Sequence, residues 1–218
     1  MTLVSLPGLD RLIAVCQRHS VAIELPSPVV SAPKAGEHVL GEPFDSQLAA
    51  VYQRIGAGVF GPVSLLPPGS GLMNLIPWNQ RLREDTSAVH FHSCHVFGQQ
   101  TGFSLYFGTV PRLADTRGHQ PVVYIPAHSG EQFAIPIASS VDRFFDLYSR
   151  YVERMVVDFE YIHTGLPELV FPWSIPELVA TDAPLIAQVR AGRFDLLMNN
   201  EEGAHEWIRA LLSPSSSS

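Results

Sequence analysis

Three side chains that can bind metal ions occupy alternate positions near the middle of the sequence: His90, His92 and Cys94. In a β-strand, alternate residues project from one face, so both imidazoles and the thiol would point the same way. Imidazole and thiolate are ligands that zinc and copper prefer. No carboxylate or second ligand cluster follows at a recognised spacing. We therefore interpret these residues as structural, with a metal site as the alternative.

Nucleophilic catalysis by Cys94 is the second function that these residues could have. Cys94 and His95 are adjacent and would lie on opposite faces of one strand, whereas a catalytic thiolate–imidazole pair must be in contact. We therefore interpret Cys94 as a small packed side chain. The sequence contains no Gly-x-Ser-x-Gly motif of serine hydrolases and neither glycine-rich motif of nucleotide-binding proteins. These observations reveal no strong catalytic motif and do not support nucleotide binding, and we expect no cofactor.

The stretch 88–107, which carries these residues, predicts two strands joined by a glycine-bounded turn at 98–102. After the turn, Phe103, Leu105 and Phe107 alternate with more polar residues, which is the periodicity of a strand. The other expected elements are an extended proline-rich loop at 25–43, a strand at 59–66, a second strand pair at 121–137, and helices at 8–19, 45–55, 139–163, 174–191 and 203–212.

The strongest helical pattern follows Ser139 and Ser140, either of which can cap a helix N-terminus. The apolar residues after them recur at helical spacing and predict a buried stripe that covers the sheet. The order of elements predicts an α+β fold, a mostly antiparallel sheet covered by helices with a helical C-terminal extension. We expect one α+β domain at 1–160, the helical extension at 161–212 and a disordered tail at 213–218.

Composition narrows the possible functions. Apolar residues make up 46% and charged residues 16% of the 218 residues, which is typical of a packed core. The net charge of −7 argues against nucleic-acid binding, because phosphate neutralisation needs clustered Lys and Arg. The sequence has two cysteines, Cys16 and Cys94, and no apolar run of the ~20 residues that cross a bilayer. We expect a cytoplasmic protein without a membrane partner and without a signal peptide.

Positions on loops and element edges are the candidates for contacts with a partner, because loops carried by a rigid sheet often mediate recognition. On position alone, we choose Trp78, Asp115 and Glu131, together with the exposed part of the central sheet. An aromatic ring can anchor a partner, and the two carboxylates suit a basic one.

Three segments share a pattern of glycines and apolar residues. Residues 51–61 form a helix that ends in a glycine-rich step, 96–108 a strand–turn–strand unit, and 132–146 a strand that enters a helix through small residues. In this order they resemble the SUKH superfamily, which contains bacterial immunity proteins and related fungal cell-wall synthesis regulators. The resemblance covers residues 44–155.

The resemblance implies a non-enzymatic binding protein, an immunity protein that neutralises a cognate bacterial toxin by direct binding. We hypothesise that the acidic surface complements a basic toxin, such as a nuclease. Two alternatives stay open: a regulatory interaction scaffold of the same fold, and a small metal-dependent enzyme that uses His90, His92 and Cys94.

Overall fold

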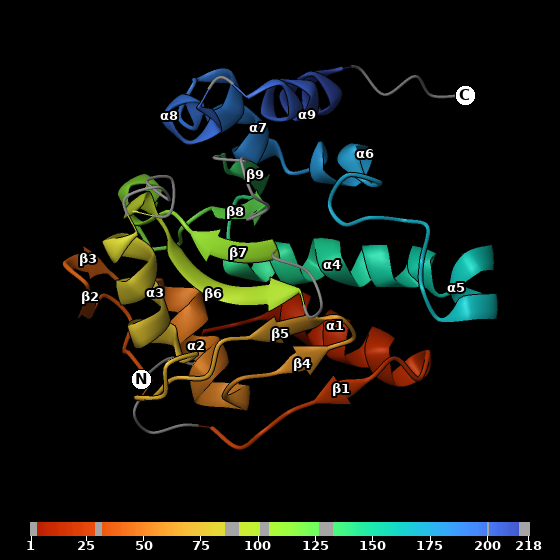
Figure 1. Ribbon diagram of the computed structural model, residues 1–218, viewed down its shortest axis with the longest axis horizontal. Coiled ribbons are helices and arrows are strands. Elements are labelled where there is room, and N and C mark those ends of the chain that lie inside the picture. Colours follow the sequence, from red (N-terminus) through yellow and green to blue (C-terminus); the bar gives the residue numbers. More distant parts are fainter. Residues whose placement is uncertain are drawn as a thin grey trace.

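Within the residues that the structure describes, seven antiparallel strands form one sheet at the centre of the protein (Figure 1). The computed structural model describes residues 4–28, 32–85, 92–100, 105–126, 133–199 and 201–213. From β4 to β9, each strand pairs with the next one along the chain, and β1 pairs with β4. The spatial order is β1 (Ile23–Glu24), β4 (Val59–Phe60), β5 (Val63–Leu65), β6 (His95–Gln100), β7 (Leu105–Thr109), β8 (Val122–Pro126) and β9 (Ile135–Ala138).

A layer of helices covers one face of this sheet, formed by α1 (Pro7–Arg18), α2 (Ser46–Ile55) and α4 (Val141–Met155) (Figure 1). The ring of Phe144 in α4 lies 5.0 Å from that of Phe107 and 5.7 Å from that of Phe97, centroid to centroid. Gly8 lets α1 approach α4 closely, because a Cβ there would lie 2.0 Å from the carbonyl oxygen of Asp142. The N–H of Gly8 donates to the Asp142 carboxylate at 2.9 Å.

The opposite face of the central strands is covered in part by α3 (Leu75–Glu84). Its Trp78 ring lies 5.9 Å from that of Tyr106, the neighbour of Phe107 in β7 and therefore on the other face. The side-chain amide of Asn79 donates to the carbonyl of Val96 and accepts its N–H, both at 2.7 Å. Asn79 thus pairs with β6 as a neighbouring strand would.

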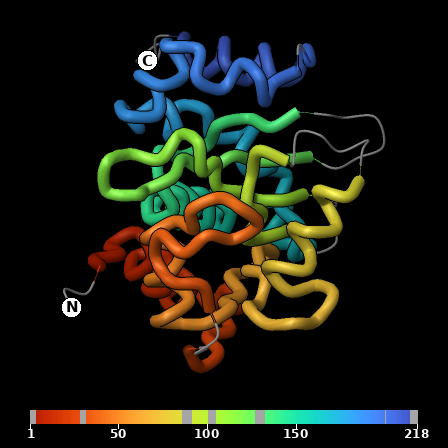
Figure 2. Tube along the Cα trace, turned by 90° about the vertical axis from the view of Figure 1, so that its left-hand side faces the viewer, coloured from red at the N-terminus to blue at the C-terminus, as the bar shows by residue number. Residues whose placement is uncertain are grey.

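The helices that follow α5 (Phe159–Thr164) form a separate tier at the β9 edge of the sheet (Figure 2). Trp207 donates its indole N–H to the carbonyl of Pro136 at 2.9 Å, and Ala134 donates its N–H to the carbonyl of Leu197 at 2.8 Å. The indole of Trp207 also packs edge-on against that of Trp173. The helices beyond α4 are α5 (Phe159–Thr164), α6 (Pro176–Val179), α7 (Ala183–Arg190), α8 (Asp195–Met198) and α9 (Glu202–Leu212).

The predicted α+β fold with an antiparallel sheet and a helical C-terminal region is confirmed. Ser140 is the residue that caps α4, where its hydroxyl accepts the N–H of Arg143. No helix among the described residues has the length and apolar character needed to cross a membrane.

Several element boundaries differ from the expectation. Gly98 lies inside β6, next to a bulge, where a Cβ would be 3.2 Å from the carbonyl oxygen of Ser64. The expected strand at 59–66 is two short strands, because Gly61 adopts a φ of +58° and turns the chain. The expected helix at 139–163 breaks into α4 and α5 at Asp158, which caps α5.

A two-stranded ribbon lies within the segment expected to be an extended loop, formed by β2 (His38–Val39) and β3 (Glu42–Pro43). Leu40 and Gly41, both with positive φ, make its tight turn. A short 3₁₀ helix, η2 (Pro111–Leu113), follows β7.

Candidate functional site

An apolar cavity of about 770 Å³ lies between one end of the sheet and the C-terminal part of α4. The sheet contributes Leu105, Tyr124 and Pro126 to its wall, and Phe133 lies just before β9. The ring of Tyr124 is held edge-on against the indole of Trp173, which also lines the cavity, at 6.1 Å between centroids. Pockets that bind drug-sized ligands have volumes of ~300–1,000 Å³, so this cavity is large enough for such a ligand or for a smaller anchoring side chain.

Tyr151 and Met155 of α4 form the second wall, together with Tyr161 of α5. The Tyr151 hydroxyl donates to the carbonyl of Leu169 at 2.8 Å, which ties the connection after α5 to α4. Burial raises the pKa of Tyr151 to about 12, with a further contribution from the nearby carboxylate of Asp158. The phenol is therefore neutral at physiological pH and serves as a hydrogen-bond donor.

The third wall comes from the N-terminal half of the chain, where Val21 and Gly61 lie beside each other. The N–H of Gly61 donates to the carbonyl of Ala22 at 2.7 Å, and a Cβ on Gly61 would lie 3.1 Å from a methyl group of Val21. The left-handed conformation of Gly61 thus brings the β4–β5 turn against the residues that follow α1. Segments far apart in the sequence meet at this cavity.

An exposed apolar segment continues outward from the cavity. We call residues 157–170, which include α5 and the connection after it, the α5 arm; Figure 1 shows α5 beyond the end of α4, projecting away from the sheet. Leu166 lines the cavity and is nevertheless 71% exposed. The other large apolar side chains of the arm that stay exposed are Val157, Phe159, Ile162 and Val170.

The backbone of the α5 arm is well fixed although its side chains are exposed. Asp158 caps α5 by accepting the N–H of Tyr161 at 3.0 Å. Gly165 ends the helix in the left-handed conformation, with a φ of +74°. The hydroxyl of Thr164 accepts the N–H of Leu166 at 3.1 Å. The apolar side chains are therefore presented on a hydrogen-bonded scaffold.

The sequence-based candidates for partner contacts lie elsewhere or cannot be placed. Trp78 is half-buried on α3, with the guanidinium of Arg81 5.6 Å from its ring centroid. Asp115 lies in the loop after η2 and accepts the N–H groups of Arg117 and His119 at 2.8 and 2.9 Å. Glu131 is outside the described residues. Neither Trp78 nor Asp115 lines the cavity as the structure describes it.

The two candidate metal ligands that the structure describes, His92 and Cys94, differ in their exposure to solvent. His90 lies outside the described residues. His92 is exposed in a helical turn before β6, with its Nε2 3.4 Å from the carbonyl of Asp85. Cys94 is fully buried, and burial raises the pKa of its thiol to about 12. Among the described residues, no three His, Cys, Asp or Glu side chains form a group that could hold a metal ion.

Two polar side chains beside Cys94, the buried His95 and the half-buried Arg83, have a structural role. The Nε2 of His95 lies 3.0 Å from the carbonyl of Val39, and Arg83 donates to the carbonyl of Leu40 at 2.6 Å. These two side chains hold the turn of the β2–β3 ribbon against the sheet. Burial, together with the charge of Arg83, lowers the pKa of His95 to about 4.

The cavity was not predicted from the sequence. The one local signal was the run of apolar residues that continues past Asp158 and Gly165, where the helical pattern ends. Comparison of the chain with protein-family models gave no match. Comparison with curated proteins gave no match either.

Proposed function

We propose that this chain is a SUKH-like, non-enzymatic binding protein that acts as an immunity protein, neutralising a cognate toxin by direct contact. The observation that carries the proposal is the cavity that opens beside the exposed α5 arm. Large exposed apolar patches on folded proteins mark sites of interaction, and five exposed apolar side chains are grouped on this one segment. The α+β fold agrees with the one that the resemblance implies.

The composition of the cavity wall favours binding over catalysis. Tyr151, Tyr161 and Gln100 contribute polar atoms, while the wall as described contains no His, Cys, Asp, Glu, Lys or Arg. The described wall therefore lacks the groups that most often act in general acid–base and nucleophilic catalysis, and the hydroxyl of Tyr151 already donates to the carbonyl of Leu169. An apolar wall with a few phenols instead suits the anchoring of an apolar side chain.

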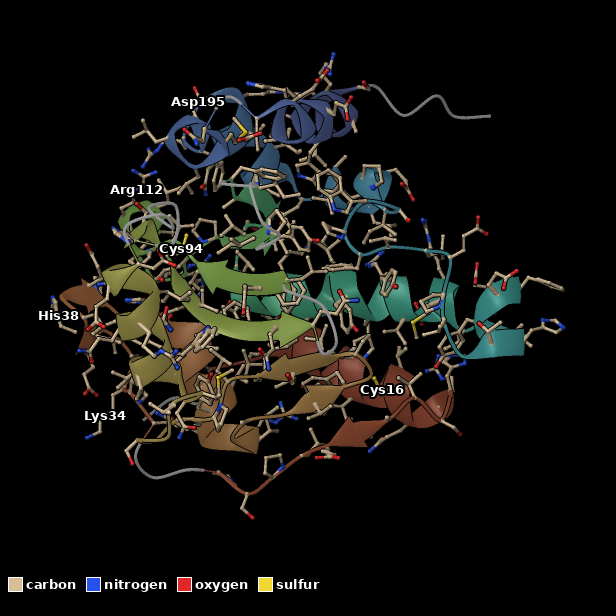
Figure 3. All side chains as sticks on the ribbon, viewed as in Figure 1. Cys16, Lys34, His38, Cys94, Arg112 and Asp195 are labelled. Atoms are coloured by element: carbon tan, nitrogen blue, oxygen red, sulfur yellow. The ribbon has the colours of Figure 1, made fainter. Side chains whose placement is uncertain are left out.

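The proposal places the protein in the cytoplasm, where a toxin made in the same cell would have to be held inactive. Cys16 and Cys94 agree with a reducing compartment, because both are buried and neither forms a disulfide within the described part of the chain. They lie in different parts of the fold (Figure 3), so these two thiols are not positioned to form a disulfide with each other.

Co-expression with the product of the adjacent gene tests the proposal. If that gene encodes a protein with a toxic C-terminal domain, we expect the two proteins to co-purify and the cells to survive only when this chain is present. Cell death despite full expression of this chain would contradict an immunity function. Co-purification with a non-toxic host protein would instead support a regulatory scaffold.

A further inference from the structure

Four carboxylates lie close in the sequence to residues that line the cavity. Asp158, Glu160 and Glu168 lie on the α5 arm, and the residues next to Glu160 and Glu168, among them Tyr161 and Pro167, line the cavity. Glu160 and Glu168 are exposed, whereas Asp158 is half-buried. Across the cavity, β1 adds the exposed Glu24 two residues beyond Ala22, another wall residue. We call these four carboxylates the acidic rim.

Within the described residues, no cation is ion-paired with a carboxylate of the acidic rim. Two arginines of the helices beside it already have partners, because Arg18 pairs with Glu153 and Arg154 with Glu177. A cationic partner would therefore meet negative charge that this protein does not neutralise itself.

We propose that the cavity and the α5 arm together bind one segment of a partner protein that is both apolar and basic. An apolar side chain of that segment enters the cavity, and its Lys or Arg side chains face the acidic rim. This inference rests on the proposed function, for which it specifies the surface that is used and the chemistry of the toxin segment.

A polypeptide fits this surface better than a small ligand does. A small apolar molecule could fill the cavity, but it would leave Val157, Phe159 and Ile162 of the α5 arm in water. The ring of Phe159 lies against that of His163, at 4.1 Å between centroids and tilted by 35°, and is not part of the cavity wall as described. A peptide segment can cover the cavity and the arm at once.

A membrane surface is disfavoured by the same charges. Exposed apolar side chains beside an interface-binding helix are normally accompanied by Lys and Arg, which attract anionic lipid headgroups. Here the flanking charges are Glu160 and Glu168, which repel such headgroups. The hydrogen bonds of Asp158, Thr164 and Tyr151 also fix the arm before binding, which lowers the entropic cost of docking.

Fluorescence anisotropy with three labelled model peptides tests this proposal. The first peptide carries a Leu and Phe stripe with Lys between the apolar residues, the second replaces Lys by Glu, and the third keeps Lys but replaces Leu and Phe by Ser. We expect binding of the first peptide alone, and weaker binding at higher salt. Equal binding of the second or third peptide would overturn the proposal.

Matched variants of this chain locate the binding. Leu166→Asp and the pair Glu160→Lys with Glu168→Lys change exposed side chains of the site, and each should weaken binding of the first peptide about tenfold or more. The controls Leu196→Asp and Glu206→Lys change exposed side chains of α8 and α9 and should leave the affinity unchanged. Undiminished binding by both site variants would place the segment elsewhere.

Binding to vesicles of phosphatidylserine and phosphatidylcholine tests whether the surface binds a membrane instead of a peptide. Stronger binding to these vesicles than to the first peptide would assign the surface to a membrane and overturn the proposal. The immunity function and the binding site can be disproved independently of each other. If Leu166→Asp still protects cells from the toxin, this site is wrong while immunity stands; if the peptide binds but no toxin is neutralised, the site stands and immunity falls.

Discussion

A single carboxylate oxygen of Asp158 joins two backbone groups of the α5 arm, accepting the N–H of Glu168 at 3.3 Å as well as that of Tyr161 at 3.0 Å. The same atom therefore starts α5 and closes the connection after it back onto the helix. This closure carries Leu166 to the cavity and Glu168 to the acidic rim. This one side chain therefore helps to fix the shape of the α5 arm at the candidate site.

Replacing Asp158 by Ala should lower the free energy of unfolding by ~1 kcal/mol, the usual cost of losing an N-cap. We expect the larger effect to be local, with faster amide hydrogen exchange across 159–170 than in α4. Chemical denaturation and hydrogen-exchange mass spectrometry measure the two effects. Asp158→Asn, which keeps an acceptor oxygen, should retain most of the protection; equal loss in both variants would show that the hydrogen bonds are not what holds the arm.

Replacing Phe144 by Ala should lower the free energy of unfolding by ~3–5 kcal/mol, because the ring is 1% exposed and contacts Phe97 and Phe107 of the sheet. Phe159→Ala is the matched control, since its ring is 69% exposed and its loss should cost well under ~1 kcal/mol. Urea denaturation compares the two variants. Similar losses would mean that α4 does not cover the sheet as described.

We expect the buried His95 to lower the free energy of unfolding as the pH falls. Its pKa is lowered from 6.5 to about 4 in the folded protein, so between these values the unfolded chain binds the proton and the folded chain does not. The stabilisation is present above pH ~6.5 and is lost as the pH falls towards ~4, by at most ~3 kcal/mol. Denaturation of the wild type and of His95→Gln across this range measures it.

The comparison with His95→Gln is needed because Asp45 acts in the opposite direction. Burial raises the pKa of Asp45 from 3.8 to about 6, so its folded form takes up the proton first and gains stability as the pH falls through this window. The Asp45 contribution is common to both proteins and cancels in the difference. A difference that stays constant from pH 7 to pH 4 would contradict the burial of the His95 imidazole.

The two thiols should be unreactive in the native protein. Burial raises the pKa of Cys16 to about 11 and that of Cys94 to about 12, and both side chains are fully inaccessible. A thiol reagent such as 5,5′-dithiobis(2-nitrobenzoic acid) should label neither before unfolding and both in denaturant. Rapid labelling of one thiol in the native state would show that its part of the core opens readily.

Patterns within short stretches of sequence correctly predicted helices and caps that depend on neighbouring residues alone. The stripe of α4 and its cap Ser140 both follow from residues within a few positions of one another. The position of Gly98 inside β6 depends on a distant contact with Ser64, and the ribbon turn depends on Arg83 and His95. Such long-range contacts leave no signal at the segment that they reshape.

The candidate site could not be predicted from the sequence, because it also depends on long-range contacts. Val21, Tyr151 and Trp173 line one cavity although they are far apart in the sequence, and only the packing of α4 on the sheet brings them together. Sequence reasoning instead chose Trp78, Asp115 and Glu131 because of their type and their positions at loops or edges. An exposed apolar run after a helix break would have been the more useful sign of the α5 arm.

The contact between Trp207 and Pro136 has a consequence for synthesis of the protein. The two residues are 71 positions apart, so β9 leaves the ribosome long before the tier that covers it. During that interval the edge of the sheet presents unpaired backbone groups, which can pair with another nascent chain. Slow translation between these positions would prolong that exposure, so yield should depend on translation speed there and on the chaperones that meet the emerging chain.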